Sequence, residues 1–122
     1  MIIVITGTHK GIGRQLAEYF LSAGHCVAGC SRHDSTIEHS NYRHCITDVR
    51  SEEQTADFAA NIRREFKYID ALINNTGIAS MNHFMMTPLE TAKNVMDVNY
   101  FGSLLCIRAF ISLLKKSEHP RI

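Results

Sequence analysis

Three glycines lie close together near the start of the chain, between an apolar run and a helical pattern. They belong to the segment Thr6-Gly7-Thr8-His9-Lys10-Gly11-Ile12-Gly13. Gly7 allows a sharp turn, while Gly11 and Gly13 allow the backbone to approach a ligand and the helix to pack on a sheet. The free N–H groups and the positive end of the helix dipole then favour an anion. The segment therefore predicts a phosphate-binding loop, with a pyrophosphate as its ligand.

The spacing of these glycines is G-x-x-x-G-x-G rather than G-x-G-x-x-G. A P-loop is excluded because no Gly-Lys-Ser or Gly-Lys-Thr follows. A purely structural turn is the alternative interpretation. A buried strand before the loop and a helix after it favour nucleotide binding over that alternative.

Two cations near this loop indicate which dinucleotide it binds. A site for NAD usually places a carboxylate at the end of the second strand, on the ribose 2′-hydroxyl. Here Ser31 and Arg32 stand at that point, and Asp34 comes two residues later than Arg32. Arg32 can bind a 2′-phosphate and Lys10 adds a second cation, although both could be solvated surface charges. We therefore expect NADP(H) to be favoured over NAD(H).

Short apolar runs alternate with helical periods along the chain. The runs predict strands at residues 2–5, 25–31, 43–47 and 70–74. Helical spacing predicts a helix that ends at Gly24, a second that begins at a capping box at Ser51, and a third from Pro88 to about Lys116. This order predicts an α/β protein: a Rossmann-like parallel sheet with flanking helices, truncated after the fourth strand and its following helix.

The length and composition are those of one ordinary globular domain, 1–122. Of the 122 residues, 45% are hydrophobic and 20% are charged. Thirteen Lys and Arg residues against twelve Asp and Glu leave a net charge of +1, so we expect no nucleic-acid partner. Residues 98–114 are apolar nearly all round, but the segment is short and carries Arg108. We interpret it as a helix buried between the sheet and another subunit, not as a membrane span.

The cysteines and histidines show no metal-ligand spacing. The four cysteines have no C-x-x-C pattern, and the seven histidines have no helical i, i+4 pair. Residues 1–5 carry no charged leader of the kind found in a signal peptide. We therefore expect surface histidines, no metal, and a reduced, cytoplasmic protein.

Four segments taken together resemble the short-chain dehydrogenase/reductase family, in its order and across the whole chain. The glycine segment matches the family motif T-G-x-x-x-G-I-G. The other three are Asp48-Val49, which matches an acidic-apolar pair; Asn74-Asn75-Thr76-Gly77, which resembles N-N-A-G; and Val98-Asn99-Tyr100-Phe101-Gly102, which resembles V-N-x-x-G. Thr76 departs from the alanine of the family pattern.

The resemblance implies a role for each segment. The cofactor would be bound by the residues Gly7, Thr8, His9, Lys10, Gly11, Ile12, Gly13, Arg32, Asp48, Val49, Asn75, Thr76 and Gly77, with Asp48 on the adenine amino group. Asn99 would hold a water in a catalytic proton relay. Three alternatives remain open: Asp48 caps the helix at Ser51, the asparagine pair stabilises the sheet, and Asn99 marks a kink or a packing contact.

The resemblance also implies catalytic residues that this sequence does not contain. The family uses a serine and a Tyr-x-x-x-Lys pair from beyond the next strand. None of the four tyrosines has a lysine four residues later. We therefore expect the cofactor-binding half of an oxidoreductase for a small carbonyl or alcohol substrate, without turnover by the chain alone.

Two surfaces are expected to be left uncovered. They are the 98–114 helix and the edge of the fourth strand, and either would favour a homo-oligomer. Two other functions remain as alternatives: a non-catalytic nucleotide-binding module, and an interaction module that only keeps the fold.

Overall fold

The computed structural model describes the backbone of residues 1–122 and every side chain except that of Phe84. Its strands are β1 (Ile2–Thr6), β2 (Cys26–Ser31), β3 (Tyr42–Ile46) and β4 (Ala71–Ile73). Its helices are α1 (Gly11–Ser22), α2 (Glu52–Glu65), α3 (Leu89–Met96) and α4 (Gly102–Leu114), with a short 3-10 turn at Phe84–Met86 and a π-helical turn at Asp97–Phe101. The predicted elements are all present, with ends that differ by at most two residues.

The four strands form one parallel sheet in the order β3-β2-β1-β4. This confirms the predicted Rossmann-like α/β fold. From β1 the chain adds β2 and then β3 on one side, and it then crosses back to add β4 on the other side of β1. The switch point of the sheet therefore lies between β1 and β4. In doubly wound sheets ligands bind at such a switch point, outside the carboxyl ends of the strands.

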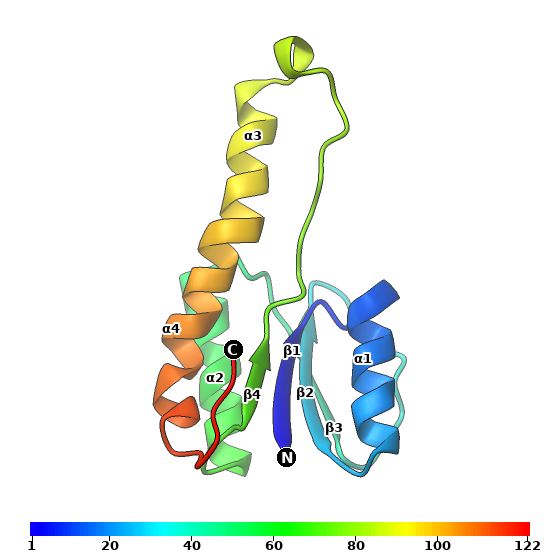
Figure 1. The fold of residues 1–122 in the computed structure, drawn as a ribbon, viewed down its shortest axis with the longest axis vertical. Coiled ribbons are helices and arrows are strands. Elements are labelled where there is room, and N and C mark those ends of the chain that lie inside the picture. The colour runs from blue at the N-terminus through cyan, green and yellow to red at the C-terminus, as the bar shows by residue number, and fades with distance from the viewer.

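Helices cover the two faces of the sheet (Figure 1). α1 lies on one face, where Ile3 and Ile5 of β1 pack against Ala17 and Leu21. α2 and α4 lie on the other face, in a cluster that includes Val4. Successive residues of β1 therefore enter opposite layers, as the alternation of side chains along a strand requires.

Two predicted helix signals are confirmed, the stop at Gly24 and the capping residue Ser51. α1 ends at Ser22, and Gly24 follows with a φ of 80°, a left-handed conformation that glycine adopts without strain. α2 begins after Ser51, whose hydroxyl accepts a hydrogen bond from the Gln54 backbone N–H at 3.2 Å. The Gln54 side chain accepts from the Asp48 N–H at 2.8 Å, so it ties the preceding loop to the helix.

The third predicted helix is continuous from Leu89 to Leu114, with the π-helical turn in its middle. Its α3 part extends beyond the sheet, whereas α4 packs on β4 and α2 (Figure 1). Phe110 of α4 meets Phe58 of α2 edge to face, with 5.0 Å between ring centroids. By length and composition alone this 26-residue helix is apolar enough to cross a membrane, a property it shares with core helices.

The edge of β4 differs from the expectation of an open edge. Arg121 forms a parallel bridge with Ala71. The Leu72 N–H donates to the Arg121 carbonyl at 3.0 Å, and the Arg121 N–H donates to the Asp70 carbonyl at 3.0 Å. The prediction was wrong for this part of the edge, because the chain returns after α4 to run beside β4.

Candidate functional site

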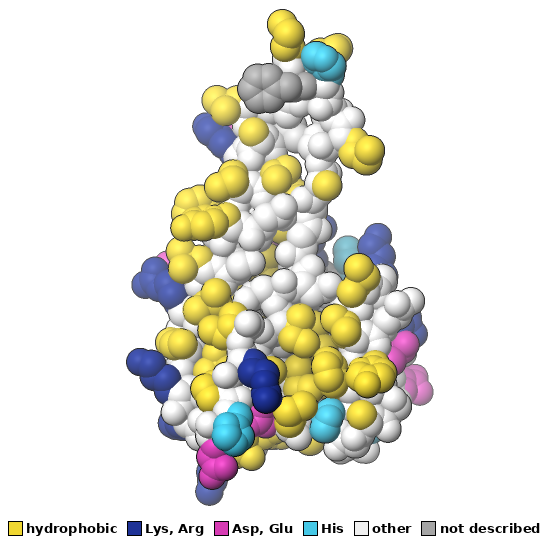
Figure 2. Space-filling view, in the orientation of Figure 1, with side chains coloured by type: hydrophobic (Ala, Val, Ile, Leu, Met, Phe, Trp, Pro, Cys, Tyr) yellow, Lys and Arg dark blue, Asp and Glu magenta, His cyan; other side chains and the backbone are white. Residues whose placement is uncertain are grey.

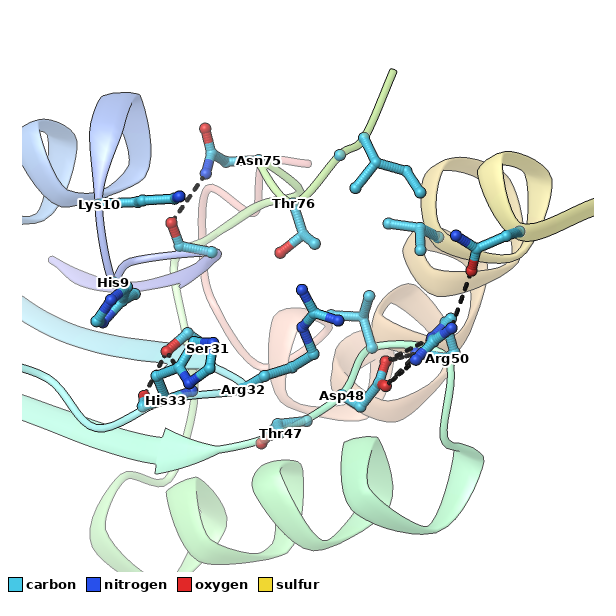
Figure 3. Close-up of a pocket in the computed structure, with 16 residues that line it drawn as sticks. His9, Lys10, Ser31, Arg32, His33, Thr47, Asp48, Arg50, Asn75 and Thr76 are labelled. Atoms are coloured by element: carbon cyan, nitrogen blue, oxygen red, sulfur yellow. Dashed lines mark hydrogen bonds and ion pairs between the residues drawn. The ribbon is translucent and has the colours of Figure 1, made fainter. Parts of the chain in front are cut away.

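An open cavity of about 600 Å³ lies at the carboxyl ends of all four strands (Figure 3). Its lining comes from the loop after each strand and from the long helix. The lining residues are Gly7, His9, Lys10, Ser31, Arg32, His33, Thr47, Asp48, Val49, Arg50, Asn75, Thr76, Gly77, Ile78, Asn94 and Val98. The cavity is large enough for a small-molecule cofactor and stands at the switch point of the sheet.

Part of the glycine loop, at Gly7, His9 and Lys10, lines this cavity. Gly7 and Gly11 have φ angles of 78° and 61°, in the left-handed region. Gly13 is buried, and a Cβ atom there would clash with the Gly7 carbonyl and the Asn75 amide. Lys10 is the N-cap residue of α1 and has no side-chain acceptor for the N–H groups of the first turn. Those groups are therefore left for an anion, so the loop fits a bound phosphate.

Asn75 joins this loop to the end of β4. Its side-chain amide donates to the Thr6 carbonyl at 2.9 Å and to the Gly7 carbonyl at 3.3 Å. The N–H groups of Asn75 and Thr76 both donate to the Thr6 hydroxyl, each at 3.0 Å. These contacts agree with the alternative that the asparagine segment stabilises the sheet, and they fix the floor of the cavity.

Lys10 and Arg32 approach the cavity from two different loops. Figure 3 shows their side chains extending into it, with no dashed contact on either. Among the described side chains neither takes part in an ion pair. Both cations are therefore available to an anionic ligand in the cavity.

Asp48 and Arg50 form an ion pair on the opposite side. The Asp48 carboxylate accepts from the Arg50 guanidinium at 2.6, 3.1 and 3.2 Å. The same guanidinium donates to Asn94 of α3 at 2.9 Å. The hydrogen bonds from Arg50 lower the pKa of Asp48, and the charge of Arg32 acts in the same direction. Asp48 is therefore held as an acceptor, and it does not cap α2, since Ser51 does.

Several predicted residues lie next to the cavity without lining it. They are Thr8, Gly11, Ile12, Gly13 and Asn99. Thr8 is fully buried and its hydroxyl contacts the Tyr42 hydroxyl, while the Ile12 side chain points to solvent. Val49, which does line the cavity, also packs against Gly102 of α4. The cofactor contacts assigned to these residues stay predictions.

Asn99 lies in the π-helical turn and contacts the chain after β4. Its side-chain oxygen accepts from the Ile78 N–H at 2.9 Å, and its amide donates to the Ile78 carbonyl at 2.8 Å. This agrees with the alternative of a helix irregularity with a packing contact. Its role in a proton relay stays a prediction.

The sequence did not identify seven of the lining residues. They are Ser31, His33, Thr47, Arg50, Ile78, Asn94 and Val98. All of them except Asn94 are adjacent in sequence to a predicted site residue, so extending each motif by one residue would have identified them. Asn94 carried no such signal, because it reaches the cavity only through the position of α3.

The cysteines take no part in the cavity, and all four are free thiols. Burial raises the pKa of Cys30 to about 12 and that of Cys106 to about 11, so both stay protonated near neutral pH. Among the described side chains, no group of three or more His, Cys, Asp or Glu residues is arranged to hold a metal ion.

Comparisons with known proteins agree with this geometry. A family model described as short chain dehydrogenase matches residues 1–122. The chain is 29% identical over 136 aligned positions to dehydrogenase/reductase SDR family member 7B of Rattus norvegicus, covering 99% of this chain and 42% of that protein. It is 31% identical over 121 positions to the NADPH-dependent pterin aldehyde reductase of Arabidopsis thaliana, covering 92% and 50%.

The fold of the chain is also similar to that of a solved dehydrogenase structure. The ligand-free aldohexose dehydrogenase of Thermoplasma acidophilum superposes with a TM-score of 0.90 at 31% identity, covering 98% of this chain and 46% of that one. The chain thus spans about half or less of the length of the proteins it matches.

Proposed function

This chain belongs to the short-chain dehydrogenase family, and we propose that it supplies the NADP(H)-binding half of an oxidoreductase that reduces a small carbonyl or oxidises a small alcohol. When bound, the nicotinamide cofactor supplies or accepts the hydride. The chain's own residues bind and orient that cofactor. The main observation behind this proposal is the glycine loop with Lys10 and Arg32 directed into the cavity beside it.

One side of the cavity carries hydrogen-bond donors and cations that suit the phosphate groups of the cofactor. The first-turn N–H groups of α1 suit the pyrophosphate, since α1 has no side-chain cap. Arg32 and Lys10 suit a 2′-phosphate, and no carboxylate stands at the position of Arg32 where it would repel that group. These groups therefore favour NADP(H) over NAD(H).

The opposite side of the cavity, at Asp48 and Val49, suits the adenine ring of the cofactor. A carboxylate has about four lone-pair sites for hydrogen bonds. The Asp48 carboxylate accepts four contacts from the Arg50 side chain and N–H, two on each oxygen, so an adenine amino group would share this acceptor with Arg50. Val49 offers an apolar contact for the ring next to it. The NADPH dependence of the plant pterin aldehyde reductase supports the same cofactor, at 31% identity.

Titration of the purified chain with NADPH and with NADH, followed by nicotinamide fluorescence, tests the proposal. We expect saturable binding of NADPH and binding of NADH that is about tenfold weaker or more, because only NADPH offers the 2′-phosphate to the two cations. Equal binding of the two would overturn the choice of cofactor. Binding of neither would overturn the nucleotide site itself.

The reaction also requires a proton transfer, and these 122 residues contain no Tyr-x-x-x-Lys pair to perform it. This observation favours a second candidate, a nucleotide-binding module without catalysis. Addition of NADPH and a panel of aldehydes and ketones distinguishes the two. Loss of NADPH absorbance would favour the oxidoreductase, whereas cofactor binding without oxidation would favour the module.

We also propose that the chain forms a homo-oligomer through residues 98–114, which lie in the π-helical turn and α4. Tyr100, Phe101, Leu104 and Ile111 are 37–57% exposed, although all four are large apolar side chains. Figure 2 shows hydrophobic side chains along the side of the molecule formed by α3 and α4. Burying such a surface favours association. A monomer mass in light scattering at micromolar concentration would exclude this proposal.

The cellular compartment is proposed to be the cytoplasm. The four free cysteines are consistent with a reducing environment. Alkylation of the protein in intact cells, followed by mass spectrometry, should label thiols without prior reduction; disulfide-linked peptides would contradict this compartment.

A further inference from the structure

A chain of hydrogen bonds beneath the cavity links the glycine loop to the loop after β2. The Thr8 hydroxyl lies 2.8 Å from the Tyr42 hydroxyl. The Tyr42 hydroxyl lies 3.0 Å from His44 Nδ1, and His44 Nε2 lies 2.9 Å from the His33 carbonyl oxygen. Three side chains and one backbone carbonyl, from the glycine loop, β3 and the loop after β2, are thus connected in series.

The His33 carbonyl at the end of this series determines which group donates in each hydrogen bond. A carbonyl oxygen only accepts, so His44 Nε2 donates to the His33 carbonyl. In the neutral ring His44 Nδ1 then accepts from the Tyr42 hydroxyl, and the Tyr42 oxygen accepts from Thr8. The Ser31 hydroxyl also donates to the His33 carbonyl, at 2.6 Å. The loop after β2 is therefore held at His33 by two donors.

Because Thr8 and Tyr42 are buried, their hydroxyl groups depend on each other and on His44 for hydrogen bonds. Thr8 is fully buried and Tyr42 is 7% exposed, so water does not replace a lost partner easily. Burial raises the pKa of Tyr42, against the effect of the hydrogen bond with Thr8, and keeps the phenol a neutral donor. Gly29 of β2 leaves the necessary space, because a Cβ atom there would clash with the Tyr42 and Thr8 oxygens.

A second contact joins the same two loops on the cavity side. His9 Nδ1 donates to the Asp34 carbonyl at 3.0 Å, and the His9 and His33 rings lie 5.2 Å apart. Lys10 follows His9 and Arg32 precedes His33 along the chain, so each cation is on a loop fixed by these bonds (Figure 3). Two cations without an anion between them repel each other. Bonds between uncharged groups of their loops can oppose that repulsion.

We propose that Tyr42 and His44 are positioning residues for the 2′-phosphate of the cofactor. They hold the loop that carries Arg32 at a fixed place relative to the glycine loop that carries Lys10, so that both cations meet one phosphate. The inference rests on the proposed NADP(H) binding. NADH has no 2′-phosphate, so its binding does not depend on this placement. Neither residue lines the cavity, and their effect is exerted through Arg32 and Lys10.

The variant Tyr42→Phe tests the proposal, with Tyr19→Phe as the matched control. Tyr19 is 65% exposed on α1, away from the cavity. We expect Tyr42→Phe to weaken NADPH binding about three- to tenfold and to leave NADH binding within about twofold, so the ratio of the two dissociation constants falls. Tyr19→Phe should leave both constants unchanged.

A second variant guards against a folding defect in the first. His44→Ala removes the next link, with His119→Gln as control, since His119 is exposed near the C-terminus. It should lower the same ratio, and circular dichroism should show a folded protein. In the wild-type chain, ¹⁵N NMR should find His44 protonated at Nε2 and accepting at Nδ1.

The outcomes separate this inference from the proposed function. A wild-type chain that binds both cofactors equally overturns the choice of NADP(H), and the positioning role with it. A wild-type preference that survives both variants overturns the positioning role alone. An equal loss of NADPH and NADH affinity in Tyr42→Phe also overturns it, because a merely structural residue would affect both cofactors alike.

Discussion

The two sides of the cavity use their polar side chains in different ways. On the side of β1 and β2, Lys10 and Arg32 extend into the cavity without an ion-pair partner among the described side chains. On the side of β3 and α3, the Arg50 guanidinium is bonded to both Asp48 and Asn94. The first side thus has charges available to a ligand, and the second has most of its charge satisfied within the protein.

This difference indicates which residues select the ligand and which shape the site. A cation without a partner gains a full charge-assisted hydrogen bond when a phosphate arrives. A side chain already bonded within the protein must share or lose a contact to do the same. Asn99 and Asn75 belong with the second group, since their amides bind backbone carbonyls of Ile78 and Thr6. We expect variants on the two sides to separate cofactor selectivity from stability.

The largest effect should come from a change that disturbs both sides at once. Gly13→Ala would place a Cβ atom against the Gly7 carbonyl and the Asn75 amide. We expect binding of NADPH and NADH to fall more than about 100-fold, and the free energy of unfolding to fall by about 1–3 kcal/mol through overpacking. Fluorescence titration and thermal melts measure the two effects. Gln15→Ala, exposed on the same helix, is the control; unchanged binding in Gly13→Ala would contradict the packing argument.

The next effect should be confined to the cationic side. Arg32→Ala should weaken NADPH binding about 10- to 100-fold, since it removes a charged donor from the 2′-phosphate. NADH binding and the melting temperature should not change, because Arg32 is exposed and has no ion-pair partner among the described side chains. Arg64→Ala on α2 is the matched control. A parallel loss of both cofactors would remove the distinction between the two sides.

A smaller effect should appear in stability on the bonded side. Asn99→Ala removes the two hydrogen bonds to Ile78. We expect a loss of about 1 kcal/mol and a melting temperature lower by about 3–6 °C. The ratio of NADPH to NADH affinity should stay within about twofold. Asn61→Ala on α2 serves as control; a changed ratio would assign Asn99 to ligand selection.

The smallest effect should come from the exposed ion pair. Arg50→Ala should change NADPH binding by less than about fivefold at pH 7. The hydrogen bonds from Arg50 lower the pKa of Asp48 in the folded protein, so their stabilisation is present above the pKa of the unfolded carboxyl, near 4. That stabilisation is lost as the pH falls through the lowered folded value. Melting temperatures of the wild type and the variant should therefore converge at low pH; a gap that widens there would contradict the assignment.

Local patterns predicted most of the fold and one side of the site. The glycine loop, the capping residue Ser51 and the stop at Gly24 act through backbone conformations of neighbouring residues, so they can be recognised without the rest of the chain. The apolar runs predicted the strands for the same reason. The open edge of β4 was predicted wrongly for the part beside Arg121, because this pairing joins residues about fifty positions apart.

The sequence by itself determined that a glycine-rich loop follows β1, and that Lys10 and Arg32 come shortly after the first and second strands. Only the tertiary structure decided that Arg50 bonds Asn94, 44 positions away, and that Thr8 meets Tyr42, 34 positions away. Residue types and short spacings fix local backbone geometry. Contacts at such separations depend on how α3 docks beside the sheet and on which strands become neighbours, and no local pattern encodes either.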